Sequence, residues 1–198
     1  MASILAVCTG NVCRSPLAEG SLRIALDARS AGTPIDVTSA GTMGWSGSSA
    51  DPLSVQAGAE RGIDISSHIA RVTTQKDLRD AALVLAMAPE HVEIVTQQVP
   101  AAAGKSFTLK ELVRLLEALP APGRGEPEAL LIARVSQADA LRRSGFEGNP
   151  HDEDIADPLG MPLEAFQAVA AELDEWCTRL ADGLLGRAPA RTSTSNED

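Results

Sequence analysis

Residues 8–16 read Cys8-Thr9-Gly10-Asn11-Val12-Cys13-Arg14-Ser15-Pro16, a short loop between a predicted strand and a predicted helix. The apolar run at residues 3–7 has the length of a buried strand. From residue 16 to about residue 26 apolar residues recur at helical spacing. Ser15 and Pro16 are typical of the cap and the first position of a helix. The sequence therefore predicts a strand, a tight loop and a helix, in that order.

The loop combines a nucleophile with groups that bind an oxyanion. Five residues separate Cys8 from Arg14, and so short a loop must curl, with Gly10 giving the backbone the freedom to do so. Its amides then turn inward beside the free amides of the helix N-terminus. Arg14 adds a planar, permanently charged fork that suits phosphate. The same positive field favours a thiolate at Cys8. The implied chemistry is attack of a thiolate on a bound phosphate.

The stretch and its context resemble the low-molecular-weight protein tyrosine phosphatase family. The family signature is Cys-x-Gly-Asn-x-Cys-Arg-Ser-Pro followed by Ala-Glu, and Ala18-Glu19 complete it here. The alternative, a buried apolar Cys8 beside a surface Arg14, fits the full pattern poorly. The resemblance spans most of residues 1–100 and about 150–185. Outside the loop it includes Ser39-Ala40-Gly41-Thr42, Trp45, Gly62-Ile63, Ser67-His68, Ala70-Arg71 and Leu85-Ala86-Met87.

Composition limits the possible partners. The 198 residues suit one domain with one core. Lys and Arg total 17 against 27 Asp and Glu, and the net charge of −10 disfavours nucleic acid or an anionic membrane as a partner. No apolar run approaches the roughly 18 residues of a membrane span, and no signal-peptide pattern precedes the first strand. Three cysteines without zinc-ligand spacing indicate a reducing compartment. We therefore expect a cytoplasmic protein; its oligomeric state stays open.

Strands alternate with helices along the rest of the chain. We expect strands at residues 34–41, 81–87 and 105–107, and helices at 52–62, 89–98, 109–119, 128–143 and 163–185. Asp51-Pro52 and the pair Thr108 and Glu111 are helix-start signals. The alternation predicts an α/β fold in which helices cover both faces of a parallel sheet, with the phosphate-binding loop at the carboxyl end of the first strand. The resemblance implies four strands with the first one central.

The sequence predicts one phosphatase-like domain over residues 1–186. Within it the chain is longer than typical family members, which indicates a helical insertion at about 119–148. Residues 187–198 are small and polar and are predicted to be a disordered tail.

A thiolate mechanism also needs an acid for the leaving oxygen and a base for the water that follows. Asp157-Pro158 matches the Asp-Pro acid loop of the family, which implies that Asp157 has both roles. The nearby acids Asp152, Glu153 and Asp154 are interpreted as a solvated acidic loop. Asp51 also precedes a proline, but a helix cap is the better reading because Pro52 suits the first helical position.

The resemblance assigns further roles within and around the loop. Phosphate binding is implied for Thr9, Gly10, Asn11, Val12, Cys13, Arg14 and Ser15, with Trp45 as a wall of the substrate cleft. Asn11 is expected to hold the loop shape, Ser15 to stabilise the thiolate, and His68 to bond Asn11. Cys13 has the position of a second redox cysteine, with a small packed residue as the alternative. The alternative for Asn11 is a turn residue and for Ser15 a helix cap. The alternative for His68 is an ordinary loop histidine, and for Trp45 partly buried packing.

Two other features of the sequence are open to a functional reading. His151 and the acids at 152–154 and 157 could suggest a metal site, but their spacing gives no fixed ligand face. The thiol route needs no metal and no cofactor, and none is expected. His91 lies on a predicted helix and is interpreted as solvated. Trp176 and Cys177 are interpreted as residues of the core or of a helix face.

The substrate implied by the resemblance is a phosphorylated protein or peptide. Val12 resembles the tyrosine-directed branch, because relatives that act on phosphoarginine carry threonine there. However, the chain has no tyrosine, and Leu159-Gly160 replaces the aromatic residues that usually follow Asp-Pro, which weakens stacking on a phosphotyrosine ring. A protein tyrosine phosphatase is therefore the first hypothesis. A protein arginine phosphatase, an arsenate reductase that uses a small thiol, and a non-catalytic phosphoryl-binding module are the alternatives.

Overall fold

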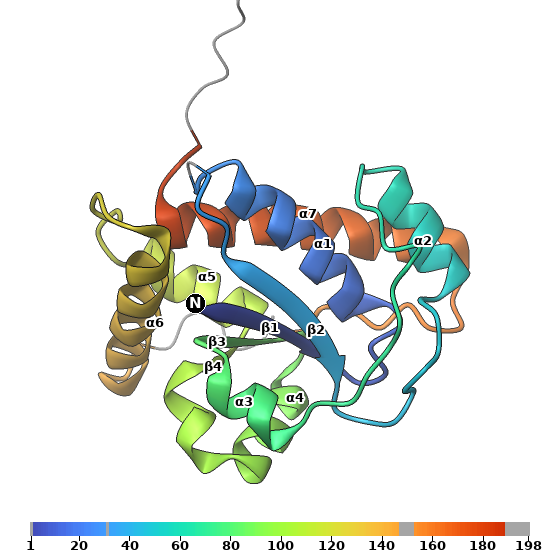
Figure 1. Ribbon diagram of the computed structural model, residues 1–198, viewed down its shortest axis with the longest axis horizontal. Helices are drawn as coiled ribbons and strands as arrows, with labels where there is room; N and C mark the ends of the chain where they lie inside the picture. Colours follow the sequence, from blue (N-terminus) through green and yellow to red (C-terminus); the bar gives the residue numbers. More distant parts are fainter. Residues whose placement is uncertain (1, 31, 147–152, 189–198) are drawn as a thin grey trace, which may run out of the picture.

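The computed structural model describes residues 2–30, 32–146 and 153–188. It contains a parallel sheet of four strands in the order β2-β1-β3-β4 (Figure 1). The strands are β1 (Ser3–Cys8), β2 (Asp36–Gly41), β3 (Leu83–Ala86) and β4 (Ser106–Thr108). The register pairs Cys8 with Gly41 and Val7 with Ala86, so the carboxyl ends of three strands meet around the residue that follows β1. The α/β fold and the central first strand are confirmed.

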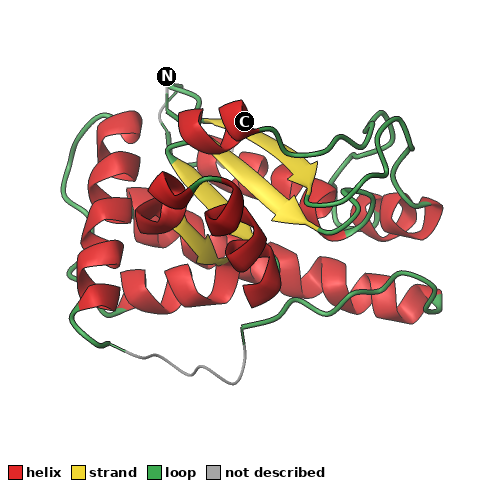
Figure 2. Cartoon of the chain, turned by 90° about the horizontal axis from the view of Figure 1, so that it is seen from below, coloured by secondary structure: helices red, strands yellow, loops and turns green. Residues whose placement is uncertain are grey.

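Helices cover both faces of the sheet, as Figure 2 shows. One face packs against α1 (Arg14–Asp27), α5 (Leu109–Glu117) and α7 (Leu163–Leu185). The other face packs against α3 (Gln75–Asp80), α4 (Pro89–Gln98) and the short 3-10 helix η1 (Pro100–Lys105). Side chains therefore alternate between two cores: Ile4 and Ala6 point into the first, Leu5 and Val7 into the second.

The start of α1 differs from the prediction. The helix begins at Arg14, with Cys13 in the cap position and no side-chain cap. Ser15 is thus inside the first turn, and the prediction that it caps the helix is wrong. Its hydroxyl lies 3.0 Å from the Cys8 Sγ atom and accepts a hydrogen bond from the Asn11 side chain, so it is directed to the loop and not to the helix amides.

Other boundaries follow local signals. Asp51 caps α2 (Pro52–Ala59): its carboxylate accepts a hydrogen bond from the Leu53 amide at 2.8 Å. The prediction that Asp51 is a helix cap is confirmed. The helix ends three residues before Gly62, which has a φ of +76°. The six-residue α3 was not predicted, because so short and polar a segment carries no apolar periodicity. Thr74 and Asp77 form its capping box.

The predicted insertion contains α6 (Pro127–Arg143), which packs against α5, α7 and η1. The guanidinium of Arg134 is buried and donates to the carbonyls of Leu116, Pro120 and Gly183. Arg142 donates to the carbonyls of Ala103 and Ser106. These bonds tie α6 to the core. That residues 119–148 are an insertion stays a prediction.

Residues 147–152 and 189–198 lie outside the described residues, and with them most of the predicted tail at 187–198. In the ranges that are described, no helix combines the length and the apolar character needed to cross a membrane.

Candidate active site

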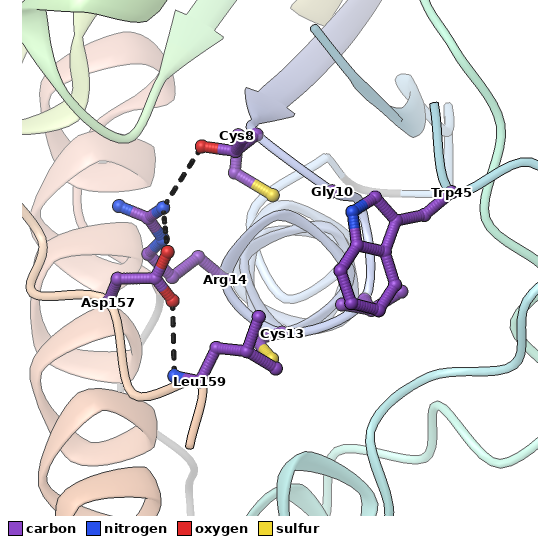
Figure 3. Close-up of a pocket in the computed structure, with 9 residues that line it drawn as sticks. Cys8, Gly10, Cys13, Arg14, Trp45, Asp157 and Leu159 are labelled. Atoms are coloured by element: carbon purple, nitrogen blue, oxygen red, sulfur yellow. Dashed lines mark hydrogen bonds and ion pairs between the residues drawn. The ribbon is translucent and has the colours of Figure 1, made fainter. Parts of the chain in front are cut away.

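The loop after β1 directs polar groups at the sulfur of Cys8. The Asn11 amide donates to the Cys8 Sγ atom at 3.3 Å, and the Ser15 Oγ atom lies 3.0 Å from it. The sulfur lies at the N-terminus of α1, as Figure 3 shows with the helix viewed end-on behind it. The backbone donor and the positive end of the helix dipole therefore both face this sulfur.

Asn11 holds the loop in shape. Among the described residues it is the only non-glycine with a positive φ, at 57°, and it is fully buried. Its side-chain amide donates to Ser15 and Ser39, both at 2.9 Å, and its side-chain oxygen accepts from the Arg71 amide at 3.0 Å. The Nε2 atom of His68 lies 2.9 Å from the Asn11 carbonyl. The expected contact between His68 and Asn11 is thus present, and it reaches the Asn11 backbone.

Gly10 has a different function in the loop from the one expected. Its φ is not positive, so the tight curl depends on Asn11 and not on the conformational freedom of glycine at position 10. A Cβ atom on Gly10 would approach the Trp45 ring to 3.2 Å, tighter than an ordinary contact. Glycine therefore allows the close approach of the indole (Figure 3).

Arg14 joins the loop to the distant acid. Arg14 is 5 % exposed, and its Nη2 atom donates to the Asp157 Oδ2 atom at 2.7 Å and to the Thr9 hydroxyl at 3.4 Å. Nη1 donates to the Ile155 carbonyl at 3.1 Å. The Asp157 side chain is 47 % exposed, and its other oxygen accepts from the Leu159 amide at 3.2 Å. The carboxylate is therefore fixed at two points and still open to solvent.

One pocket of about 150 Å³ brings most of the predicted residues together. Trp45, which is 45 % exposed, and Leu159 stand at its rim. Asn11, Ser15 and His68 are not in its lining; they support the loop from behind. The lining residues are Cys8, Thr9, Gly10, Val12, Cys13, Arg14, Trp45, Asp157 and Leu159.

Cys13 lines the same pocket as Cys8 but has a different environment. It is 3 % exposed, and burial raises the pKa of its thiol to about 12. Cys13 is therefore a neutral thiol at physiological pH. Like Cys8 and Cys177, it is not part of a disulfide. Cys177 is fully buried on α7, as its core interpretation expects, and Trp176 beside it packs its ring against the Arg179 guanidinium.

His91 belongs to the site, and its interpretation as a solvated residue is wrong. It is 1 % exposed, and its Nε2 atom lies 3.0 Å from the Thr9 hydroxyl. Burial lowers the pKa of the imidazole, and the positive charge of Arg14 lowers it further. Its Nδ1 atom has no hydrogen-bond partner in the described part of the chain. The sequence feature that could have indicated this role is the position of His91 shortly after the carboxyl end of β3, where parallel sheets bind their ligands.

The two described acids near Asp157, Glu153 and Asp154, have different environments. Asp154 is exposed, as expected of a solvated loop. Glu153 is not solvated: its carboxylate pairs with Arg114 and accepts from the Thr108 hydroxyl, so that interpretation is wrong. His151 and Asp152 lie outside the described residues. The ranges that are described contain no group of three or more side chains suited to hold a metal ion.

Comparison with known proteins agrees with this geometry. The family model "Low molecular weight phosphotyrosine protein phosphatase" matches residues 3–126. The chain is 35% identical over 147 residues to the low molecular weight protein-tyrosine-phosphatase Etp of Escherichia coli strain K12, which covers 72% of this chain and 95% of Etp. It is 32% identical over 181 residues to a protein-arginine-phosphatase of Geobacillus stearothermophilus, which covers 91% of this chain and 95% of that protein.

Solved structures are similar over nearly the whole chain. The low molecular weight protein tyrosine phosphatase from T. tengcongensis has a TM-score of 0.68 at 34% identity and covers 93% of this chain and 100% of its own. The YwlE arginine phosphatase from Geobacillus stearothermophilus has a TM-score of 0.67 at 30% identity and covers 93% of both chains. The protein therefore belongs to the low molecular weight protein tyrosine phosphatase family, a family of cysteine-dependent hydrolases.

Proposed function

We propose that this enzyme hydrolyses phosphotyrosine in proteins through a phosphocysteine intermediate on Cys8. The main support for the proposal is the position of the Cys8 sulfur. Cys8 accepts the Asn11 amide at 3.3 Å in the pocket that also contains the Arg14 guanidinium and the Asp157 carboxyl group. A nucleophile, an oxyanion cradle and a proton donor are the groups that a two-step phosphoryl transfer needs.

In the first step the Cys8 thiolate attacks phosphorus, and the bond from phosphorus to the leaving oxygen breaks. Protonated Asp157 gives its proton to that oxygen, which leaves as a phenol. Arg14, now paired with Asp157 at 2.7 Å, turns its fork to two phosphoryl oxygens. The amides of the loop after β1 bind the charge that develops on the transferred group.

In the second step water attacks the phosphocysteine. Asp157, ionised after the first step, accepts a proton from the water, while the Cys8 sulfur leaves as the thiolate. Ser15, 3.0 Å from that sulfur, donates a hydrogen bond to it as the negative charge returns. Inorganic phosphate leaves, and the original protonation states are restored.

Phosphoarginine is the second candidate substrate, because a protein-arginine-phosphatase is 32% identical to this chain over 91% of its length. Against it stands Val12, whose apolar side chain lines the pocket and offers no hydroxyl to a guanidinium. The pocket rim carries Leu159 and Trp45, so an aromatic ring would have one apolar wall and one stacking partner.

Initial rates on phosphotyrosine and phosphoarginine peptides of the same sequence test this assignment. We expect a higher kcat/KM for phosphotyrosine, and Val12→Thr should shift the ratio towards phosphoarginine. A higher kcat/KM for phosphoarginine in the unchanged enzyme would reverse the assignment.

Arsenate reduction remains a further candidate, since arsenate has the shape and charge of phosphate. Each turnover would need electrons from an added small thiol, because Cys13 is buried and neutral and Cys177 lies in the core. We expect arsenite formation with that thiol to be far slower than ester hydrolysis. A comparable rate would favour the reductase.

We also propose that the enzyme acts in the cytoplasm on phosphorylated proteins. Its three cysteines are free thiols in the structure, which suits a reducing compartment.

A further inference from the structure

The segment at residues 153–159, called here the acid loop, carries Asp157 and passes the carboxyl end of β3. Its centre is fixed by Ile155, which is fully buried. The Ile155 amide donates to the Met87 carbonyl at 2.9 Å, just past β3, and its carbonyl accepts from Arg14 at 3.1 Å. The acid loop is therefore attached both to the sheet and to the arginine of the phosphate cradle.

The start of the acid loop is attached to α5 through Glu153. Its carboxylate forms an ion pair with Arg114 and accepts a hydrogen bond from the Thr108 hydroxyl at 2.5 Å. The side chains of Glu153 and Arg114 are both 17 % exposed. Thr108 also caps α5, since its hydroxyl accepts the Glu111 amide at 3.1 Å. A carboxylate at this helix end has a bonded cap and the positive end of the helix dipole beside it.

Some of the bonds that hold the acid loop are lost in the proposed reaction, and others persist. When Arg14 turns its fork to a phosphoryl group, Asp157 loses its 2.7 Å partner and Ile155 loses its 3.1 Å donor. The bonds that do not depend on Arg14 are the Ile155 amide bond to Met87 and the contacts of Glu153 with α5. The anchor at Glu153 is thus most needed in the state in which Asp157 transfers its proton.

From this arrangement we infer that Glu153 is a positioning residue for the acid: its contacts with Arg114 and Thr108 keep Asp157 over the leaving oxygen once Arg14 has turned to the phosphate. The inference rests on the proposed role of Asp157 as general acid. Glu153 does not touch the reacting atoms, and its effect reaches them only through the backbone between residues 153 and 157. Loss of the anchor therefore weakens protonation of the leaving group and spares phosphate binding.

The test compares kcat/KM for p-nitrophenyl phosphate, which has a good leaving group, and phenyl phosphate, which has a poor one. In Glu153→Gln we expect kcat/KM for phenyl phosphate to fall about tenfold more than for p-nitrophenyl phosphate, a part of the roughly 10²- to 10⁴-fold that general acid catalysis supplies. The inhibition constant of inorganic phosphate should change by less than about twofold, because the cradle does not include Glu153. Arg114→Met should act in the same way, and Arg114→Lys should lose less because it keeps the charge.

The matched control is Glu172→Gln. Glu172 also pairs with a basic residue of α5, Lys110 at 2.7 Å, but its own position is on α7 and not on the acid loop. This variant should keep the wild-type ratio of kcat/KM for the two esters.

Asp157→Asn separates the inference from the proposed function. In that background Glu153→Gln should have little further effect on the ratio, because the acid that it positions is gone. If Asp157→Asn itself leaves the ratio unchanged, the proposed acid is wrong. If Asp157→Asn changes the ratio but Glu153→Gln lowers both esters equally, or weakens phosphate binding, Glu153 only stabilises the fold and the inference is overturned.

Discussion

The Oδ2 atom of Asp157 lies 2.7 Å from the Nη2 atom of Arg14, so the acid of the proposed reaction is paired with the arginine that the phosphate needs. Binding of a phosphate dianion must open this pair, because one planar fork cannot chelate two oxyanions in the same geometry. The exchange releases a carboxyl group that is 47 % exposed in the free protein. It thus places the acid next to the substrate at the moment of binding.

Replacing the nucleophile should separate binding from chemistry. We expect Cys8→Ser to lower hydrolysis of aryl phosphates by about 10⁶-fold, because the route through phosphocysteine then has no thiolate nucleophile. The cradle is held by Asn11 contacts with Ser15, Ser39 and Arg71, so phosphate binding measured by calorimetry should persist. Substantial activity in Cys8→Ser would contradict the phosphocysteine mechanism.

Arg14→Lys tests the geometry of the fork. Lysine keeps the positive charge but cannot present the two parallel N–H donors that the planar fork offers to an oxyanion. We expect kcat/KM to fall by about 10²- to 10³-fold, the usual effect of losing an oxyanion donor. A fall of only a few-fold would show that charge alone suffices at this position.

Asp157→Asn should change the pH dependence of hydrolysis as well as its rate. Loss of a protonated acid should flatten the basic limb of the profile of kcat/KM against pH for phenyl phosphate, while the acidic limb persists. Asp154→Asn is the control, since Asp154 is an exposed acid of the same loop and should behave like the wild type. A preserved basic limb in Asp157→Asn would leave Asp157 with a purely structural role.

The strand, loop and helix around Cys8 could be predicted because their signals are local. An apolar run, a glycine, an arginine and a proline all lie within residues 3–26. The order of the four strands depends on tertiary packing, and the family resemblance implied only that there are four and that the first is central. Two contacts were expected of the Ser15 hydroxyl, one with the helix amides as a cap and one with the Cys8 sulfur. The folded loop has only the second, at 3.0 Å, because one hydroxyl cannot face both.

The missed residues of the site depend on contacts that are distant in sequence. His91 lies 82 positions after Thr9, and Glu153 lies 45 positions after Thr108. A histidine on a helix and a glutamate in an acidic stretch are usually solvated, and neither position has a local pattern that indicates burial. Both contacts exist only in the folded chain, where His91 meets Thr9 of the loop after β1 and Glu153 meets Thr108 at the start of α5.

Burial of His91 predicts a pH dependence of stability. Its pKa is lowered from an ordinary value of 6.5, so below that pH the unfolded chain binds a proton that the folded protein excludes. The free energy of unfolding should therefore fall as the pH drops below about 6.5, by at most about 1.4 kcal/mol per pH unit from this group. Denaturant unfolding at pH 7.5 and 5.5 measures the fall, which should be smaller in His91→Gln.

Other groups in the protein also bind protons between these two pH values. Their contribution to the free energy of unfolding is common to the wild type and His91→Gln, so the difference between the two isolates His91. His68→Gln is the matched control, because His68 is part-buried and bonds a backbone carbonyl. If His91→Gln and the wild type lose the same free energy between the two pH values, His91 is protonated as readily in the folded protein as in the unfolded chain.

The last prediction concerns Cys13, which lines the same pocket as Cys8. Peroxide should oxidise the Cys8 thiolate to a sulfenic acid; attack by the Cys13 sulfur then forms a disulfide and releases water. Because burial raises the pKa of Cys13 to about 12, its thiolate fraction grows about tenfold per pH unit near neutrality. Disulfide formation, followed by mass spectrometry of the linked peptide, should therefore accelerate between pH 7 and pH 9.

Recovery of activity shows whether this disulfide protects the enzyme. After peroxide and then dithiothreitol, the wild type should regain most of its activity, while Cys13→Ala should regain little, because its sulfenic acid continues to the sulfinic and sulfonic acids. Cys177→Ala is the control, since that thiol lies in the core on α7 and should leave recovery unchanged. Equal recovery of Cys13→Ala and the wild type, or no linked peptide at any pH, would leave Cys13 as a small packed residue at the start of α1, where its burial and its neutral thiol already account for its presence.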